Sequence, residues 1–314
     1  MVDGVIIVKK AIVTGATGFI GRYLVQELIA KNIDVIAVVK DENSNTSGLE
    51  NYDRVCIVHC DLDHMRELPS KIHDRSAEVF FRLAWEGSSG DYRTNERLQM
   101  KNSLSTVDAL KASSEMGCKR FVGAGSIMEK EPIYAVYAQT NRPGESYIYG
   151  MGKLAAHMAS KSIASSMGIE HVWGLITNAY GPGELSPRFV NTTLRRVLRG
   201  EPLKFTSATQ NYDFVFVTDV AKAFFSIGIN GIPFKNYTIG SSRPAPLRSF
   251  ICQMLQVTGS NISPQFGDIP FSGVDLPTKE FSTADLEQDT GFRPRVSFSE
   301  GIRKTLDWLK QMEA

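Results

Sequence analysis

Ala11-Ile-Val-Thr-Gly-Ala-Thr-Gly-Phe-Ile-Gly21 is the stretch that decides the fold. It passes from a β-branched strand through a glycine turn into a helical pattern that continues to Ala30. Gly15 permits the tight turn, Gly18 lets the backbone approach a pyrophosphate, and Gly21 lets the helix pack close to the strand. The helix N-terminus then offers unpaired N–H groups to the phosphates. Because the turn lies in the first strand–helix unit, its spacing predicts a dinucleotide site.

Strand and helix patterns alternate over the first 180 residues. The predicted strands are Ala11–Thr14, Asp34–Val39, Val55–His59, Val79–Leu83, Phe121–Gly125 and His171–Thr177. The helical patterns between them are Phe19–Ala30, Arg97–Gly117 and Glu145–Met167. Gly117 and Gly168 fall where helix C-caps belong. Near-continuous apolar strands separated by helices predict an α/β protein with a doubly wound parallel sheet, the Rossmann fold.

The rhythm changes after Gly181-Pro-Gly183, where segments become shorter and proline and glycine more frequent. We therefore predict a dinucleotide-binding domain over residues 1–184. Residues 185–314 are expected to form a smaller mixed α/β substrate lobe, interleaved with the first domain.

Composition excludes several classes of protein. With 35 Lys+Arg against 34 Asp+Glu, the chain of 314 residues has no electrostatic footprint for nucleic acid. The 4 cysteines lack a CxxC spacing and the 5 histidines lack an HxxxH pair, so we expect neither a disulfide framework nor a metal site. No apolar run reaches the roughly 20 residues that span a bilayer. These observations predict a cytoplasmic enzyme without a membrane partner.

Tyr149-Gly-Met-Gly-Lys153 lies on the third helical pattern, between the fifth and sixth predicted strands. Residues four apart share a helix face, so the lysine ammonium can lie near the phenol. A nearby cation lowers a tyrosine pKa, which predicts Tyr149 as a general acid/base. The alternative is a packed aromatic residue beside a solvated lysine.

Several motifs, spread over nearly the whole chain, resemble the extended short-chain dehydrogenases/reductases, a group of nucleotide-sugar epimerases, dehydratases and reductases. The matching segments, in order, are Thr14–Gly21, Asp61-Leu62, Leu83-Ala84 (with Arg82 in place of the usual His), Asn102, Asn178-Ala-Tyr-Gly-Pro-Gly183, Phe214-Val-Phe-Val-Thr-Asp219-Val-Ala, Thr290-Gly-Phe-Arg-Pro294 and Glu300-Gly-Ile302.

This resemblance implies the roles of the site residues. The cofactor-binding residues it implies are Gly15, Thr17, Gly18, Phe19, Ile20, Gly21, Lys40, Asp61, Leu62, Leu83, Ala84, Asn102 and Lys153. Tyr149, Lys153 and Ser126 would be catalytic, with Lys153 also bonding the nicotinamide ribose and Ser126 polarising the substrate oxygen. The alternative for Ser126 is a turn cap.

The residues after Ser126 separate subclasses of the family. The dehydratases carry an Asp-Glu pair there, whereas this chain has Ile127 and Met128, with Glu129 one position late. Neither Ile127 nor Met128 can move a proton, so we do not expect dehydration.

Residues at the end of the second strand contact the 2′ group of the cofactor's ribose in this fold. An acid there binds the ribose diol of NAD, and a cation accommodates the 2′-phosphate of NADP. This chain has Val39 where the acid would be, followed by Lys40. We therefore expect NADP(H) to be preferred and NAD(H) to be possible, unless Lys40 is only a solvated strand end.

Arginines that hold the substrate diphosphate in many family members are absent: the equivalent segments read Asn211-Tyr212-Asp213 and Phe266–Gly273, and a third position is Leu175. The residues that could replace them are Arg188, Arg195, Arg243 and Lys279, and the alternative for each is an exposed surface charge. We expect Asn178, Arg188 and Tyr212 to bind substrate, with Tyr212 stacking on a base or simply packing.

The function expected from these residues is hydride transfer between NAD(P) and a sugar carbon, as a nucleotide-sugar 4-ketoreductase. The alternatives are a 4-epimerase that retains its NAD, a reductase of a non-nucleotide ketone, and a non-catalytic dinucleotide-binding protein. The expected partners are a small-molecule substrate and a second copy of the chain in a homodimer.

Overall fold

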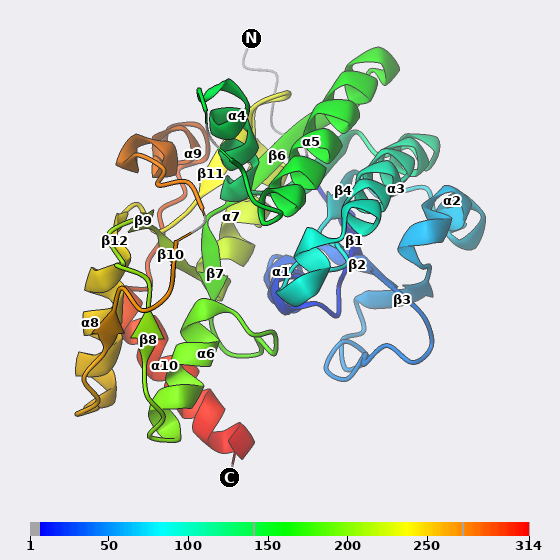
Figure 1. Cartoon of the computed structure of the whole chain (residues 1–314). Coiled ribbons are helices and arrows are strands. Elements are labelled where there is room, and N and C mark those ends of the chain that lie inside the picture. The colour runs from blue at the N-terminus through cyan, green and yellow to red at the C-terminus, as the bar shows by residue number, and fades with distance from the viewer. Residues whose placement is uncertain (1–6, 141, 272, 314) are drawn as a thin grey trace.

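A seven-stranded sheet forms the centre of the molecule in the computed structural model, which describes residues 7–140, 142–271 and 273–313 (Figure 1). All its pairings are parallel, and the strand order is β11-β6-β5-β4-β1-β2-β3. The strands are β1 (Lys10–Thr14), β2 (Asp34–Val39), β3 (Val55–His59), β4 (Val79–Arg82), β5 (Arg120–Ser126), β6 (Glu170–Ile176) and β11 (Asn236–Ile239).

The strand order reverses direction at β1, which pairs with β2 on one side and with β4 on the other. The chain therefore winds outward through β2 and β3, then returns to β4 and winds the other way. In doubly wound sheets, ligands bind in the crevice outside the carboxyl ends of the strands at this switch point. The fold thus directs attention to the residues that follow β1 and β4.

Helices cover both faces of the sheet. One face carries α1 (Phe19–Ala30) and α7 (Val217–Asn230), whose apolar side chains join the strand residues in one core. The other carries α3 (Glu96–Glu115) and α5 (Tyr147–Met167), which lie side by side (Figure 1). The inner strands are buried on both faces, which explains their near-continuous apolar runs, whereas the edge strand β3 leaves Cys56 and His59 exposed. Within the described ranges, no helix is both long and apolar enough to cross a membrane.

A second layer of short strands and helices lies beside the sheet, towards the C-terminus (Figure 1). Its helices are α6 (Phe189–Leu198), α8 (Leu247–Thr258) and α10 (Phe298–Glu313), whereas α9 (Ala284–Thr290) packs against α7 and β11 of the main sheet layer. Its paired short strands are β7 (Asn178–Tyr180), β8 (Lys204–Phe205), β9 (Asn211–Tyr212), β10 (Phe214–Phe216), β12 (Ala245–Pro246) and β13 (Gln265–Phe266). α6, α8 and α10 share an aromatic-rich core centred on Phe214 and Phe250. The remaining helices are α2 (Leu68–Lys71) and α4 (Lys130–Tyr137), with 3-10 turns η1 (Leu62–Glu67), η2 (Gly90–Thr94), η3 (Ile127–Glu129) and η4 (Thr278–Phe281).

The predicted parallel α/β sheet is confirmed, and the six predicted strands are present with boundaries that differ by at most one residue at either end. Gly168 caps α5 in the left-handed conformation, as its position predicted. The seventh strand, β11, was not predicted. β11 and α7 follow residue 184 yet belong to the sheet and its covering layer, and the division at 184/185 stays a prediction.

Candidate active site

A cavity of about 480 Å³ opens at the carboxyl ends of β1, β2, β4 and β5, and we call it the glycine-turn cavity. It lies at the topological switch point, where this fold binds ligands. Most of the predicted site residues line it: Gly15, Thr17, Gly18, Phe19, Ile20, Gly21, Lys40, Asp61, Leu62, Leu83, Ala84, Ser126, Tyr149, Lys153 and Arg188. The fold therefore brings together residues that span more than half of the sequence.

The glycine turn fits a dinucleotide. Gly15 adopts φ +71°, and a Cβ there would lie 2.8 Å from the backbone of Ala84. A Cβ at Gly21 would overlap the carbonyl oxygen of Gly15, so only glycine allows α1 to start so close to β1. Gly18 caps α1 without a side chain, which leaves the N–H groups of the first turn open to a phosphate. This backbone cradle is the part of the cavity that would hold the pyrophosphate.

The end of β2 presents one cation to the cavity. Val39 is buried, whereas the Lys40 side chain is 61% exposed and its Nζ lies 3.7 Å from Asp61 Oδ2. Because Asp61 also lines the cavity, it partly neutralises the charge that a 2′-phosphate would meet. Any contribution of Lys40 to cofactor choice is therefore small.

Asn102 does not line the glycine-turn cavity, and its assignment as a cofactor-binding residue stays a prediction. Its side chain is buried and bonds both backbone groups of Glu86, donating to the carbonyl at 2.8 Å and accepting from the N–H at 3.1 Å. With both ends of the amide engaged, Asn102 fixes the loop after β4, and Glu86 on that loop lines the cavity.

Lys153 lies buried on α5, where its ammonium is held by two neighbours. Nζ donates to the Ala124 carbonyl at 2.8 Å and lies 3.8 Å from the centre of the Trp85 ring. Burial lowers the pKa of Lys153 to about 7, with Glu129 opposing the shift. Sequence reasoning missed Trp85, although it directly follows the matched Leu83-Ala84 pair and its ring packs edge-on to Tyr149 at 6.2 Å.

Tyr149 faces the cavity from the first turn of α5, but its pKa moves in the direction opposite to the expected one. Burial raises the pKa of the phenol, while Arg188, Arg93 and a hydrogen bond with the Ser126 side chain act against that rise. The Arg93 guanidinium lies 4.6 Å from the centre of the Tyr149 ring. The cations that act on the phenol are thus Arg93 of η2 and Arg188 at the N-cap of α6, whereas the Lys153 ammonium is held by Ala124 and Trp85.

Ser126 ends β5 and has both of the roles considered for it. Its Oγ accepts a hydrogen bond from the Met128 N–H at 3.2 Å, so it caps η3, and it also bonds Tyr149. Glu129 completes the capping box by accepting from the Ser126 N–H at 2.9 Å. Its two oxygens also contact Trp173 Nε1 at 3.0 Å and His157 Nδ1 at 2.9 Å. Glu129 is therefore a buried structural acid that points away from the cavity.

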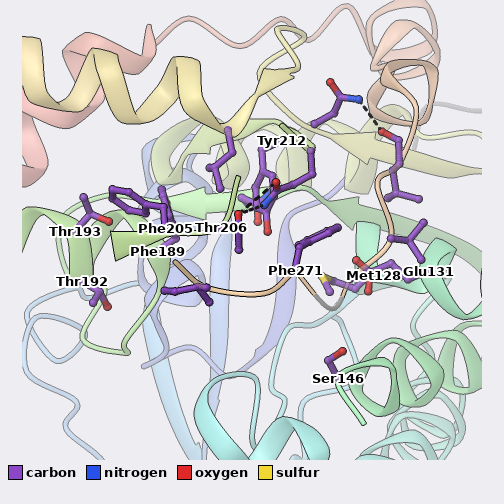
Figure 2. Close-up of a pocket in the computed structure, with 18 of the residues that line it drawn as sticks. Met128, Glu131, Ser146, Phe189, Thr192, Thr193, Phe205, Thr206, Tyr212 and Phe271 are labelled. Atoms are coloured by element: carbon purple, nitrogen blue, oxygen red, sulfur yellow. Dashed lines mark hydrogen bonds between the residues drawn. The ribbon is translucent and has the colours of Figure 1, made fainter. Parts of the chain in front are cut away.

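A second cavity of about 450 Å³ lies next to the first, between the sheet and the C-terminal lobe. Figure 2 shows Met128 and Glu131 at one end of it and Phe189 and Phe205 at the other, with Phe271 between. Asn178, Tyr212 and Arg93 also line this second cavity. Arg93 and Glu131 were missed in the sequence, although the loops after β4 and β5 are where this fold places ligand-binding groups.

The predicted substrate residues differ in their surroundings. Tyr212 stacks on Phe214, with ring centres 5.7 Å apart, and it lines the second cavity. Arg188 lines the glycine-turn cavity but forms an ion pair with Glu184 at 3.0 Å. Arg195 pairs with Glu313 on α10 instead.

The remaining two candidate cations, Arg243 and Lys279, line neither cavity as far as the structure describes them. Arg93, Arg196 and Lys204 line the second cavity instead, and Lys204 is engaged by Asp268 at 3.3 Å.

The doubly wound sheet, the glycine cradle and the Tyr149–Lys153–Ser126 group define a dinucleotide-dependent enzyme of the short-chain dehydrogenase/reductase type. A sequence profile of the NAD dependent epimerase/dehydratase family matches residues 11–240. The chain therefore belongs to this family and is an enzyme of the extended short-chain dehydrogenase/reductase type.

Individual relatives cover almost the whole chain at low identity. CDP-abequose synthase of Salmonella typhimurium is 24% identical over 311 residues, which are 96% of this chain and 98% of that protein. UDP-glucose 4-epimerase of Mycolicibacterium smegmatis is 24% identical over 314 residues, with 96% and 98% covered. Among solved structures, a UDP-glucose 4-epimerase from Thermotoga maritima with UDP-glucose has a TM-score of 0.79 at 22% identity, covering 97% of this chain and 100% of that one. At that identity the structural match supports the fold.

Proposed function

We propose that this enzyme transfers hydride between a nicotinamide cofactor in the glycine-turn cavity and a carbon of a nucleotide sugar in the second cavity. The observation that carries the proposal is the position of Tyr149: it lines the first cavity, while the Arg93 that stacks on its ring lines the second. A substrate oxygen can therefore reach the phenol while its carbon faces the cofactor. The bound nicotinamide would supply or accept the hydride.

The chain's own residues position and protonate the reacting oxygen. Tyr149 exchanges a proton with it, and Ser126 donates a hydrogen bond to the same oxygen. Burial favours the neutral phenol, so Tyr149 is ready to donate a proton to a ketone that is being reduced. Lys153 would donate a hydrogen bond to the ribose of a bound nicotinamide cofactor.

Reduction of a 4-keto sugar is the reaction that we favour. A neutral Tyr149 is the correct protonation state for that direction, and the locked Glu129 with Ile127 and Met128 leaves no acid for dehydration. The second candidate is a 4-epimerase that retains NAD. The Lys40–Asp61 ion pair favours it, because it weakens the attraction of Lys40 for the 2′-phosphate of NADPH. A reductase of a non-nucleotide ketone would not need a second cavity of this size. A non-catalytic dinucleotide-binding protein would not need Tyr149 beside Ser126.

Two measurements separate these functions. Mass spectrometry of the purified protein identifies any retained dinucleotide. The enzyme is then given UDP-, dTDP- or CDP-linked 4-keto sugars with NADPH or NADH while absorbance at 340 nm is followed, and in parallel the 4-hydroxy sugars, whose 4-epimers are separated by chromatography. A reductase consumes the reduced cofactor stoichiometrically, whereas an epimerase interconverts 4-hydroxy sugars without net consumption. Failure to produce either change with any of the three nucleotides would contradict the proposed function.

We expect the parent enzyme to bind NADPH a few-fold to about tenfold more tightly than NADH, because an exposed charge pair contributes on the order of 1 kcal/mol. Lys40→Ala removes the cation and should abolish the difference. Val39→Asp adds an acceptor for the ribose diol and a charge that repels the 2′-phosphate, so it should reverse the preference. Parallel fluorescence titrations of both cofactors measure these ratios. A parent that prefers NADH would show that Lys40 is a solvated strand end and would favour the epimerase.

We also propose that the enzyme is a homodimer. The exposed apolar side chains Met100 and Leu104 on α3 and Met151 and Met158 on α5 lie on the two adjacent helices of the same layer. Sedimentation of the parent and of Leu104→Glu tests this proposal, and a parent that sediments as a monomer contradicts it.

A further inference from the structure

Glu131 is a buried carboxyl group with no hydrogen-bond or ion-pair partner among the residues that the structure describes. It lies in the first turn of α4 and is 8% exposed, and it lines the second cavity. Within the described ranges, no side chain or backbone group forms a hydrogen bond or ion pair with its carboxylate. An acid taken out of water without compensation is costly, so such a group points to a ligand that completes its bonds.

Arg93 is an equally incomplete neighbour. It lines the same cavity from η2, and its Nε is buried without a hydrogen-bond partner in the part of the chain that the structure describes. Arg93 and Glu131 attract each other electrostatically but form no ion pair across the cavity. Two opposite, unsatisfied groups facing one space suit a ligand that both accepts and donates hydrogen bonds.

The position of this pair identifies which part of a substrate it would meet. Arg93 stacks on Tyr149, so the pair lies at the reacting end of the second cavity. Figure 2 shows Glu131 at the end opposite Phe189, Phe205 and Thr192. A nucleotide sugar whose reacting carbon faces Tyr149 places its sugar ring at the Glu131 end and its nucleotide towards α6.

We propose that Glu131 and Arg93 select the substrate sugar: the Glu131 carboxylate accepts hydrogen bonds from its hydroxyl or amino groups, and Arg93 donates to its ring and hydroxyl oxygens. The inference rests on the proposed function and narrows the substrate class to sugars without a carboxylate, because a uronic acid would place a second negative charge beside Glu131. Hydroxyl and amino groups of a sugar both donate hydrogen bonds to a carboxylate, so the titrations below compare a glucose nucleotide with its amino-sugar analogue.

The charge state of Glu131 makes the proposal sensitive to pH. Burial raises the pKa of Glu131 to about 7, with Arg93 acting against the rise. The other groups that face it are Tyr147 on α5 and Tyr212 on β9, whose pKa values are raised above 10, so neither titrates near neutrality. Lys130, beside it in sequence, is engaged by Glu280 at 2.8 Å. Below pH 7 the carboxyl is protonated and must lose its proton to accept bonds, so sugar affinity falls by up to tenfold per pH unit; above pH 7 it is constant.

The test compares Glu131→Gln with the parent, both carrying Tyr149→Phe so that no substrate turns over during titration. Protein loaded with the oxidised form of whichever cofactor it binds more tightly is titrated calorimetrically with UDP-, dTDP- and CDP-glucose, and the tightest ligand is studied at pH 6 and 8. Its nucleoside diphosphate, its glucuronic acid analogue and its amino-sugar analogue are then titrated. Glu115→Gln, at the exposed end of α3, is the matched control, and circular dichroism confirms folding of each variant.

We expect the parent to bind the glucose nucleotide about tenfold more weakly at pH 6 than at pH 8, and Glu131→Gln to lose that difference. Glu131→Gln should bind the sugar nucleotide at least about tenfold more weakly at pH 8, bind the diphosphate alone as the parent does, and discriminate less against the glucuronic acid. Lys153 also titrates near pH 7, but its effect is common to both proteins and cancels in the comparison. If the natural substrate is an amino sugar, the amino-sugar analogue should lose more affinity than the glucose nucleotide when Glu131 is replaced by Gln. If the natural donor is a hydroxyl group, the glucose nucleotide should lose more.

The outcomes separate the inference from the proposal beneath it. If the parent binds none of the nucleotide sugars, the proposed function fails. If the parent binds one and Glu131→Gln matches it in affinity, pH profile and discrimination, the inference alone is overturned and Glu131 is only a buried wall of the cavity.

Discussion

Tyr149→Phe is expected to slow turnover by roughly 10²–10⁴ while the dissociation constant of the cofactor changes by no more than a few-fold. The variant removes only the oxygen that exchanges a proton with the substrate. The ring remains, so its contacts with Trp85 and Arg93 are kept. Steady-state rates with the substrate found in the cofactor assay, together with a cofactor titration, measure both effects.

The control for this variant is Tyr237→Phe on β11. Tyr237 is also buried, and its hydroxyl bonds Asp289 and the Ile232 N–H, but it lines neither cavity. Losing these bonds should lower the free energy of unfolding by about 1 kcal/mol and leave turnover unchanged at temperatures where the protein is folded. If Tyr149→Phe is as active as the parent, Tyr149 is not the general acid/base of the reaction.

The glycine cradle could be predicted from sequence because it depends on local backbone geometry. The pattern is local, because Gly15, Gly18 and Gly21 directly follow the first strand and lie within seven residues of one another. It can therefore be recognised in the amino-acid sequence. The same holds for Tyr149 and Lys153, which share one helix face. Their spacing does not determine the pKa of Tyr149, which burial raises. It also does not determine the partners of the Lys153 ammonium, which are Trp85 and the Ala124 carbonyl.

Arg93, Glu131 and β11 show where local reasoning stops. Arg93 follows β4 and Glu131 follows β5, and only the adjacency of those strands brings the two side chains to one cavity. Each alone resembles an ordinary surface charge in the sequence. β11 was missed for a related reason, since its short segment lies among Pro- and Gly-containing loops and becomes a strand by pairing with the edge of β6.

Gly18→Val should abolish measurable dinucleotide binding while the sheet stays folded. Gly18 has an ordinary extended backbone, with φ −71° and ψ 169°, which valine adopts without strain. A Cβ there would lie 3.1 Å from the Gly15 carbonyl oxygen, a tight contact that a small shift relieves. The branched methyls, however, would fill the space above the first turn of α1 that the pyrophosphate needs. Each charge-assisted bond is worth about 1.5–3 kcal/mol, so losing two of them weakens binding by roughly 10²–10⁴.

Gly21→Ala is the contrasting variant, because it disturbs the packing of α1 against β1 and not the space that the ligand occupies. Its Cβ would overlap the backbone oxygen of Gly15, and no side-chain rotation can relieve a clash with the main chain. We therefore expect Gly21→Ala to lower the melting temperature or prevent folding, whereas Gly18→Val keeps the parent's circular dichroism spectrum and melting temperature within a few degrees. Calorimetric titration of NAD and NADP completes the comparison. If Gly18→Val binds either cofactor as tightly as the parent does, the pyrophosphate does not lie on this turn, and the dinucleotide must enter the cavity in another orientation.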